Sequence, residues 1–552
     1  FAATAPHAPP TAPPSCPMRA FMAIWHGAPS LWAAAAASLA WPAAGSGPSD
    51  LWVAGLSGFT SQTWGASSRI GTELMEDLIN SNPSILPGYQ LKTFFQDTQC
   101  DATRTLEHLF HGAVSRKYDV VPPVSDLNDT NGNQELEAHE YVTERWNASH
   151  VPGIAGVLGP DCSRATRRTM PAFNDQRLPV ISGCASSPAL SDRNLYPNFW
   201  RTVAPETTCA FAWLALAHSI GQRTVSYVAD IFGLELVDSI REAAARFNIT
   251  VQGLDAGGLS REWVLDPVTP ANARLIVSRL AANPTRFLLT PNYVGTNGIL
   301  LCEAYKQGLL GFIWTAFSWL PGGWAELPYG DCTGDEVKAA AGRFVTCGQR
   351  FFNMDNSTSL TCAPGVSGLE WRRQFYQRHG KAPGDTSVVP GKGFTASPYG
   401  PPYADALCML ALALHEFIFN RGYTLADMYG HNETSFLELQ AFLAQTDFIG
   451  ATGRVRYDPG SPDPLAAFEL SQPAAAGFVE VASYEPGGRG LIFTGEPLRF
   501  LDLILTPQAQ SSDAGGQIEV FRTCGGDETL DFRSNGCVAL AAACPAGFFY
   551  SA

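Results

Sequence analysis

The chain has 552 residues, of which 45% are hydrophobic and 16% charged, and its 36 basic and 51 acidic side chains leave a net charge of −15. This length exceeds one ordinary hydrophobic core, so two or three domains are expected. No run of Lys or Arg marks a nucleic-acid-binding face, and an acidic surface repels phosphate backbones. The composition therefore excludes nucleic acid as a partner.

The thirteen cysteines could serve redox chemistry, a metal or disulfides. They form no C-x-x-C pair and no Cys/His cluster with zinc spacing, which favours an oxidising compartment. Glycosylation sequons support secretion, because their acceptor asparagines lie on the surface of secreted proteins. Five sequons occur, at Asn128, Asn147, Asn248, Asn356 and Asn432.

The N-terminal sequence also indicates secretion. Residues 1–17 are rich in Pro and Ala and predict a disordered leader. A positive residue after Met18 precedes a small and apolar stretch that ends in Ala-Ala-Gly, so residues 18–45 are predicted to be a signal peptide that is cleaved near its end. A membrane anchor is the alternative, which His26 and Pro29 disfavour because they interrupt the apolar stretch. No later segment offers ~20 uninterrupted apolar residues.

Short apolar runs alternate with helical patterns from residue 51 onward. Residues 51–56 predict a strand, and Ile70, Leu74 and Leu78 share one face of the helix that follows. Residues 153–158 are apolar on both faces, as in a strand covered by helices on both sides. A second series begins near residue 205, with predicted strands at 225–228, 287–289 and 312–314. This alternation gives parallel sheets, and two series predict two α/β lobes.

Some segments outside these two series do not follow the alternation of strands and helices. Helices are predicted at 366–378, 403–418 and 435–446, and short strands such as 455–457 finish the module near residue 505. Residues 115–150 are polar, carry two sequons and predict a surface insertion. Residues 506–522 include a Gln-, Ser- and Gly-rich linker. Three cysteines then lie close together in residues 523–552, which predicts the start of a Cys-rich, disulfide-stapled module.

Common catalytic motifs do not occur in the sequence. There is no G-x-S-x-G elbow, no H-E-x-x-H, no phosphate-binding G-x-x-x-x-G-K-[ST] and no G-x-G-x-x-G after a strand. His108 and His111 lie three residues apart, but no Cys or acidic cluster accompanies them, so we expect no metal site. We expect no cofactor and no enzyme activity, with an enzyme of unfamiliar site as the alternative.

Two short segments carry a family resemblance. One is Leu-Gly-Pro-Asp-Cys-Ser at residues 158–163, and the other is Val-Ile-Ser-Gly-Cys-Ala-Ser-Ser-Pro-Ala-Leu-Ser-Asp-Arg at residues 180–193. Both resemble the first lobe of the ligand-binding ectodomain of class C G-protein-coupled receptors, and most closely the agonist-binding subunit of the type-B (metabotropic) GABA receptors. The resemblance covers about residues 51–500, apart from the insertion, and includes Cys-Glu-Ala-Tyr-Lys at 302–306.

The resemblance implies a periplasmic-binding-protein-like fold, an α/β clamshell of two lobes that closes on a ligand at the carboxyl ends of parallel strands. In each lobe a parallel sheet has helices on both faces. The implied division assigns residues 46–204 and 334–450 to lobe 1, 205–333 to lobe 2, and 451–505 to closing strands that both lobes share.

The resemblance also implies a ligand site. Ser163 and Ser186 correspond to the serines that hold the carboxylate of GABA, with Ser187 beside them. Serines at strand-to-helix junctions suit an anion, because hydroxyls and free backbone N–H groups point into the cleft. The implied site also has three aromatic residues. Tyr293 binds the carboxylate together with the serines, and Trp64 and Trp319 line the two sides of the site.

Two positions depart from the family pattern at the amine end of the site. Val203 stands where the family has a histidine, and Tyr399 stands where it has a glutamate. A buried ammonium without an acceptor is costly, so we expect GABA to bind weakly unless another acceptor, such as Asp230, takes that role. The ligand is then another small carboxylate, or the chain has lost agonist binding.

Two disulfides follow from the resemblance, Cys100 with Cys162 and Cys302 with Cys332. Cys408, inside an apolar helical stretch, is expected to be a free buried thiol. No role is assigned to the remaining cysteines of the two lobes, which are Cys184, Cys209, Cys347 and Cys362.

The class of protein that the resemblance implies is a cell-surface receptor. Its ligand-binding module lies on the extracellular side, dimerises through lobe 1 and is attached to the membrane through a C-terminal region beyond this chain. A soluble solute-binding protein is the alternative, which the Cys-rich stub disfavours because a free binding protein does not need one.

Overall fold

The structure is a computed structural model that describes residues 48–60, 64–112, 117–134, 136–147, 153–255, 257–282, 285–320, 323–342, 344–385, 387, 389–429, 432–474, 477–486, 490–498, 528–531 and 536–539. The predicted leader, signal peptide and linker (1–17, 18–45 and 506–522) lie outside the described residues. Of the predicted Cys-rich module, the structure describes an antiparallel pair, β22 (Glu528–Asp531) and β23 (Gly536–Ala539).

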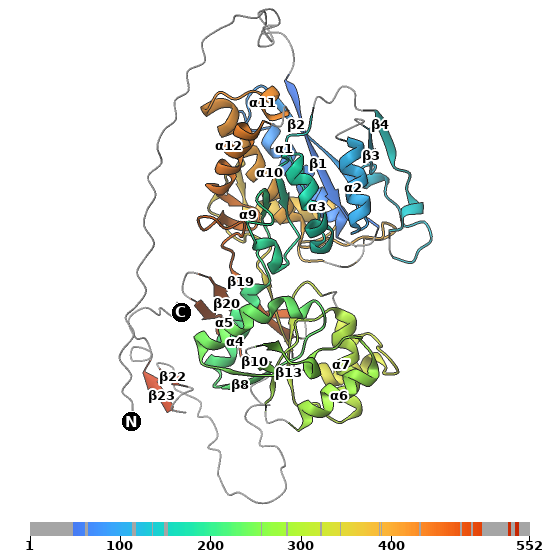
Figure 1. The fold of residues 1–552 in the computed structure, drawn as a ribbon, viewed down its shortest axis with the longest axis vertical. Helices are drawn as coiled ribbons and strands as arrows, with labels where there is room; N and C mark the ends of the chain where they lie inside the picture. Colours follow the sequence, from blue (N-terminus) through green and yellow to red (C-terminus); the bar gives the residue numbers. More distant parts are fainter. Residues whose placement is uncertain are drawn as a thin grey trace, which may run out of the picture. The chain divides into compact units, whose positions relative to one another are not determined.

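The first sheet has five parallel strands in the order β2-β1-β5-β6-β7. Neighbouring residues of these strands point to opposite faces, so that Leu158 and Ile181 belong to one apolar core and Val157 and Val180 to another. Helices therefore cover both faces, and we call this sheet with its helices lobe 1 (Figure 1). Its strands are β1 (Ser49–Ser57), β2 (Tyr89–Asp97), β5 (Val157–Leu158), β6 (Val180–Ser182) and β7 (Phe199–Arg201).

The helices of lobe 1 come from both ends of the chain. They are α1 (Gly65–Asn80), α2 (Ala102–Phe110), α3 (Ser163–Asp175), α9 (Gly368–Arg378), α10 (Gly400–His415), the π-helical turn η8 (Glu416–Asn420), α11 (Leu425–Tyr429) and α12 (Glu433–Ala444). The early helix α1 packs directly on the late helix α10. Their backbones approach so closely that a Cβ on Gly71 would lie 2.3 Å from the carbonyl oxygen of Gly400. Glycine is therefore required at this contact.

The second sheet has eight strands in the order β21-β20-β19-β14-β13-β12-β8-β9. The strands from β9 to β14 are parallel, whereas β19, β20 and β21 are antiparallel additions. We call this sheet with its helices lobe 2. Its strands are β8 (Thr224–Tyr227), β9 (Thr250–Gln252), β12 (Phe287–Leu289), β13 (Ile313–Phe317), β14 (Phe344–Gln349), β19 (Phe468–Ala474), β20 (Gly477–Glu485) and β21 (Gly490–Phe493). Its helices are α4 (Thr207–Ser219), α5 (Val237–Phe247), α6 (Pro270–Ala281), α7 (Val294–Lys306) and α8 (Gly334–Ala341).

The lobe boundaries differ from the expected ones in two places. Residues 334–349 lie in lobe 2 rather than lobe 1, because α8 packs on α7 and β14 pairs with β13. The strands β19 to β21 also join the lobe 2 sheet, so these strands are not shared between the lobes. The hairpin of β17 (Asp447–Gly450) and β18 (Gly453–Arg456) packs on lobe 1 through Phe448 and Val455. The chain therefore crosses between the lobes near residues 203–206, 350–353 and 457–467.

The predicted surface insertion carries part of the lobe 1 core. Its strands β3 (Lys117–Val120) and β4 (Glu144–Asn147) pair antiparallel, and the ring of Tyr118 lies 4.7 Å from that of Phe94 in β2. The hydroxyl of Tyr141 donates a 2.8 Å hydrogen bond to Asp97 at the end of β2. Short polar stretches between these anchors explain why the sequence is typical of a loop.

The structure contains four disulfides among the described residues. Two are the pairs that the resemblance implies, Cys100–Cys162 and Cys302–Cys332, and a third joins Cys209 to Cys347. The expectation that Cys408 is a free thiol is wrong, because Cys408 of α10 is bonded to Cys362, with Cα atoms 5.9 Å apart. An apolar helix position does not distinguish a thiol from a half-cystine, since both are among the most buried side chains. Cys184 is the buried free cysteine of the described part.

Four of the five sequon asparagines are exposed: Asn128, Asn248, Asn356 and Asn432. Asn147 lies at the end of β4, and its side chain is outside the description. In the described part of the chain, the continuous helix Gly400–Asn420 is long and apolar enough to cross a membrane by length and composition alone. It is the central helix of the lobe 1 core, where 78% of its most apolar window is buried.

Candidate ligand-binding site

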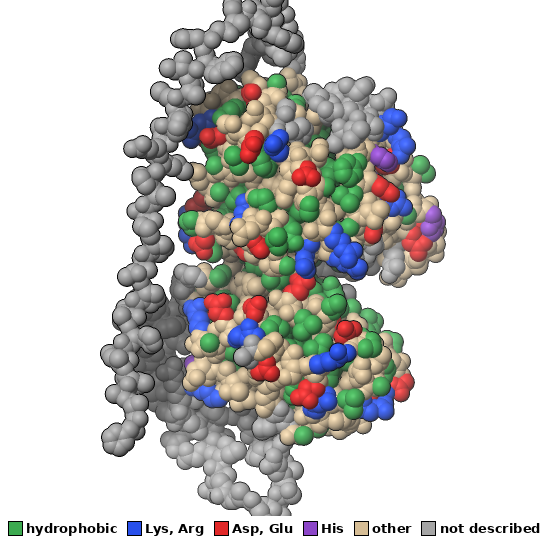
Figure 2. All heavy atoms as spheres, viewed as in Figure 1, with side chains coloured by type: hydrophobic (Ala, Val, Ile, Leu, Met, Phe, Trp, Pro, Cys, Tyr) green, Lys and Arg blue, Asp and Glu red, His purple; other side chains and the backbone are tan. Residues whose placement is uncertain are grey.

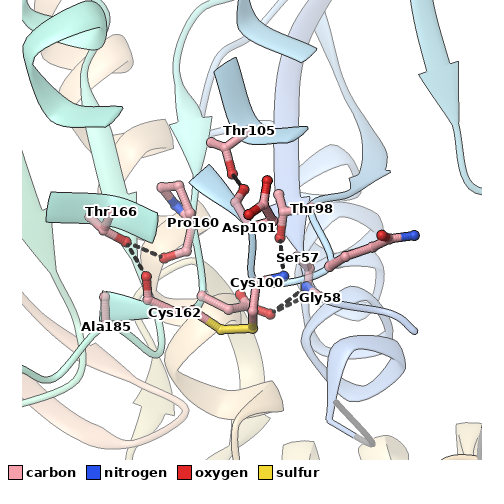
Figure 3. Close-up of a disulfide and its surroundings, with 12 residues drawn as sticks. Ser57, Gly58, Thr98, Cys100, Asp101, Thr105, Pro160, Cys162, Thr166 and Ala185 are labelled. Carbon is pink, nitrogen blue, oxygen red and sulfur yellow. Dashed lines mark hydrogen bonds between the residues drawn. A yellow bond between two sulfur atoms is a disulfide. The ribbon is translucent and has the colours of Figure 1, made fainter. Parts of the chain in front are cut away.

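The end of β5 and the start of α3 place Ser163 at the edge of the lobe 1 sheet. The chain leaves β5 through Gly159 and Pro160, and Ser163 is the first residue of α3. The first N–H groups of a helix have no partners within it, so they suit an anion. The disulfide between Cys100 and Cys162 ties this junction to the loop after β2 (Figure 3).

The loop after β6 places Ser186 and Ser187 beside Ser163. Ser182 holds this loop, because its hydroxyl donates to Pro160 and accepts from the N–H of Ala185 at 3.0 Å. The N–H of Ser187 donates a 3.1 Å hydrogen bond to the hydroxyl oxygen of Ser163. The structure thus brings these three serines together, and we call Ser163, Ser186 and Ser187 the serine cluster.

A buried carboxyl group supports the serine cluster from within lobe 1. Asp161 accepts hydrogen bonds from the hydroxyl of Ser57 at 2.5 Å, from the N–H of Gly58 at 3.0 Å and from the hydroxyl of Tyr403. Burial raises the pKa of Asp161 to about 7, although the hydrogen bond from Ser57 lowers it. Asp161 thus joins β1 and α10 to the turn that carries Ser163.

Two hydroxyls of the serine cluster donate hydrogen bonds to carboxyl groups of the protein. Ser186 donates to Glu206, which lies where the chain crosses into lobe 2. Ser187 donates to Glu235 in the 3-10 turn η5 (Gly233–Leu236) of lobe 2, at 2.5 Å. Neither acid lies in the two segments that carry the resemblance, so the sequence did not predict them as site residues. The only available signal was that Glu206 follows the resembling segment within a few residues.

Glu206 is an unusual group for such a site. Its side chain belongs to a residue that is only 5% exposed, and its Oε2 atom has no hydrogen-bond partner among the described residues. Burial raises the pKa of Glu206 to about 7, while the hydrogen bond from Ser186 lowers it. A buried polar atom without a partner is costly, so Glu206 is suited to accept a hydrogen bond from a ligand.

The aromatic side chains of lobe 2 form one group. Tyr293 precedes α7 and is 50% exposed, and its ring lies 4.9 Å from that of Phe232 and 6.2 Å from that of Trp319. Trp319 is stacked on Phe317. The pKa of Tyr293 is raised, first by burial and then by the charges of Asp230, Glu235 and Glu206. Tyr293 therefore shares the acidic environment of the serine cluster.

The aromatic side chains of lobe 1 form a second group. The ring of Trp64, which precedes α1, lies 5.7 Å from that of Tyr399, and Tyr399 also contacts Phe351 at 5.1 Å. Tyr399 is buried, and burial raises its pKa well above the ordinary value, with smaller contributions that include the charge of Glu206. Tyr399 cannot act as an anion there. Val203 is buried and offers no polar side-chain atom.

Asp230 does not provide the missing acceptor. Its carboxylate accepts hydrogen bonds from the N–H groups of Phe232, Gly233 and Tyr293 and from the hydroxyl of Thr296. These four bonds fill the lone pairs of a buried carboxylate. Asp230 instead fixes the start of α7, which positions Tyr293.

The described residues of this site include no group of side chains that could hold a metal ion. Elsewhere in the described residues, Cys302, Asp331 and Cys332 lie within ligand distance of one another. Both sulfur atoms are joined in a disulfide, so this group lacks the thiolates that bind a metal.

Comparison with known proteins agrees with the fold. The model of the family described as "Receptor family ligand binding region" matches residues 72–464, which is more than half of the chain. The chain belongs to this family. Its periplasmic-binding-protein-like fold accounts for the two α/β lobes, and the resemblance to class C receptor ectodomains is confirmed.

The curated relatives of this family member are receptors. Gamma-aminobutyric acid type B receptor subunit 1 of Mus musculus is 24% identical over 404 residues, which cover 71% of this chain and 36% of that protein. The protein of the same name in Caenorhabditis elegans is 24% identical over 370 residues, which cover 65% of this chain and 38% of that protein. Glutamate receptor 3.1 of Oryza sativa subsp. japonica is 25% identical over 69% of this chain. The chain spans just over a third of these relatives.

Proposed function

We propose that this chain is the extracellular ligand-binding region of a cell-surface receptor and binds a small amino-acid-like molecule between its lobes. The observation that carries the proposal is the serine cluster, which lies at the carboxyl ends of β5 and β6 and at the start of α3. Ligands of open α/β sheets bind at this edge. In this proposal the ligand carboxylate lies against the Ser163 hydroxyl and the first N–H groups of α3.

The amine of the ligand is assigned to Glu206. The two departures from the family pattern, Val203 and Tyr399, leave no acid at the expected positions. Glu206 supplies a buried carboxyl oxygen that has no partner in the described part of the chain, and its charge acts on both Tyr293 and Tyr399. A zwitterion with its ammonium at Glu206 would satisfy that oxygen and gain a charge-assisted hydrogen bond.

The rest of the receptor function is also a proposal. The relatives are named as receptors, and this chain, which matches the receptor family ligand-binding region, spans just over a third of their length. Membrane attachment and signalling are assigned to parts of the protein outside this chain, and a dimer contact is assigned to lobe 1. Light scattering of the purified protein would show twice the mass that mass spectrometry measures for its single chain.

Calorimetry with a panel of amino acids, ω-amino acids and simple carboxylates tests the proposal. Ser163→Ala should weaken binding about tenfold or more, because one hydrogen bond to a charged group is lost. Ser278→Ala is the matched control, since this serine is exposed on α6 of lobe 2. Binding of no member of the panel, or equal binding by Ser163→Ala and the wild type, would overturn the assignment.

A further inference from the structure

One carboxylate of lobe 2 binds two groups of lobe 1. The Oε2 atom of Glu235 accepts a 2.5 Å hydrogen bond from the hydroxyl of Ser187, and its Oε1 atom accepts a 2.8 Å hydrogen bond from the guanidinium of Arg167. Arg167 lies on α3, one turn after Ser163, and Ser187 belongs to the serine cluster. Glu235 therefore accepts hydrogen bonds from two donors that lie beside the position that we assign to the ligand carboxylate.

The electrostatic setting of this contact favours an anion. α3 carries Arg164, Arg167 and Arg168, and basic side chains gather at one edge of lobe 1 (Figure 2). The helix N-terminus adds positive potential at the same place. Glu235 brings the complementary charge from the other lobe.

The two bonds of Glu235 differ in strength. The ion pair with Arg167 is partly exposed, with 41% and 27% of the two side chains accessible, so it contributes little. Ser187 is 1% exposed, and its hydroxyl would lose its acceptor in a dry environment if Glu235 were removed. Of the two bonds, the hydrogen bond to Ser187 is therefore the stronger link between the lobes.

We propose that Glu235 is an internal competitor of the ligand carboxylate: it latches lobe 2 to the serine cluster when no ligand is bound. A free carboxylate must displace Glu235 from Ser187 before it binds. The identity of the competing ligand rests on the proposed function, whereas the latch itself is observable without any ligand. Glu235 thereby lowers the apparent affinity for every carboxylate that must displace it.

The latch is tested first in the ligand-free protein. Spin labels are introduced as unnatural amino acids at Leu437 on α12 and Leu275 on α6, both exposed, and pulsed EPR measures the distance between the lobes. Glu235→Ala should shift the distribution to longer distances, and Ser187→Ala should produce the same shift. The double variant should add nothing, because both changes remove one contact. Glu242→Ala, an exposed acid on α5, is the control and should leave the distribution unchanged.

The second measurement is ligand affinity. Acetate, butyrate and GABA should each bind Glu235→Ala about tenfold more tightly than the wild type, since one hydrogen bond to a charged group no longer competes. Glu235→Gln, which keeps the size of the side chain, should give a smaller gain.

The outcomes separate the latch from the proposed function. An unchanged distance distribution in Glu235→Ala and Ser187→Ala overturns the latch, whatever binds. A shifted distribution, without binding of any carboxylate to either protein, supports the latch and overturns the proposed ligand class. Weaker carboxylate binding by Glu235→Ala overturns the competition, because it makes Glu235 a partner of the ligand.

Discussion

The hydroxyl of Ser186 donates a hydrogen bond to Glu206, so the serine that the family resemblance assigns to a ligand carboxylate already holds a carboxyl group of the protein. The second oxygen of Glu206 has no partner among the described residues. A bound carboxylate next to this group would be repelled if Glu206 were ionised, whereas an ammonium would be attracted. The pair therefore favours a zwitterionic ligand over a simple anion.

Replacing Glu206 should remove the preference for an amine. The wild-type protein should bind GABA about tenfold more tightly than butyrate, and Glu206→Gln should bind both alike, since the amide carries no charge to attract the ammonium. Isothermal titration calorimetry measures both ligands on both proteins. An unchanged GABA to butyrate ratio in Glu206→Gln would move the amine site elsewhere.

Ligand binding at Glu206 should also release a proton. Because the pKa of Glu206 is raised to about 7 by burial, the group is partly protonated at pH 7, and an arriving ammonium should lower that pKa and release a proton. Titrations in buffers of different ionisation enthalpy measure this release. Glu206→Gln is the control, and proton release that persists in this variant belongs to another group.

Asp161 should contribute more to stability than any exposed acid. Asp161→Ala leaves Ser57, Gly58 and Tyr403 without their acceptor and should lower the free energy of unfolding by roughly 3 kcal/mol. Asp238→Ala is the matched control, because that side chain is 94% exposed and its ion pair with Arg241 contributes little. Urea denaturation measures both, and equal losses would contradict the role of Asp161.

The sequence predicts the fold well and the site in part, for identifiable reasons. The sequence predicts β1, α1 and β5 because each carries buried apolar residues at the spacing of its own secondary structure. The membership of β14 in lobe 2 could not be predicted, because it depends on pairing with β13 on one side and with β19, more than a hundred residues later, on the other. A short apolar strand carries no record of its distant partner.

The sequence likewise predicts some residues of the candidate site and not others. The family resemblance predicts Ser163, Ser186 and Ser187 as site residues because it lies in contiguous motifs that follow two strands, and their role in binding stays a prediction. Glu235 was missed because its role depends on a contact between side chains 48 residues apart, from different lobes. Cys408 was misassigned because helix composition gives no information on the position of Cys362.

Buried acids should make part of the stability depend on pH. Burial raises the pKa of Asp405 to about 7 in the folded protein, against about 3.9 in an unfolded chain. The folded state therefore retains a proton that the unfolded state loses, so the contribution of Asp405 is fully present below about pH 4 and falls as the pH rises to about 7. His379, whose pKa burial lowers to about 4, acts in the opposite direction between about pH 4 and 6.5.

The comparison with Asp405→Asn isolates this effect from His379. Asparagine cannot titrate, so the stability difference between wild type and Asp405→Asn should shrink by pH 8 relative to pH 5, in urea unfolding at constant ionic strength. A difference that grows with pH would mean that the ionised form of Asp405, bonded to Ala451 and Thr452, is the favoured one.

The Cys362–Cys408 bond should be detectable directly and should stabilise lobe 1. Peptide mapping of protein from a secretory host, under non-reducing conditions, should link the two cysteines and find Cys184 as a thiol. The bond closes a loop across 46 residues of sequence, so replacing both cysteines by serine should lower the free energy of unfolding by about 4 kcal/mol on the loop-entropy model. Cys184→Ser is the control variant, because it removes a cysteine without opening a loop. Recovery of Cys408 as an alkylated thiol from the native protein would restore the expectation from sequence and leave Cys362 to another partner.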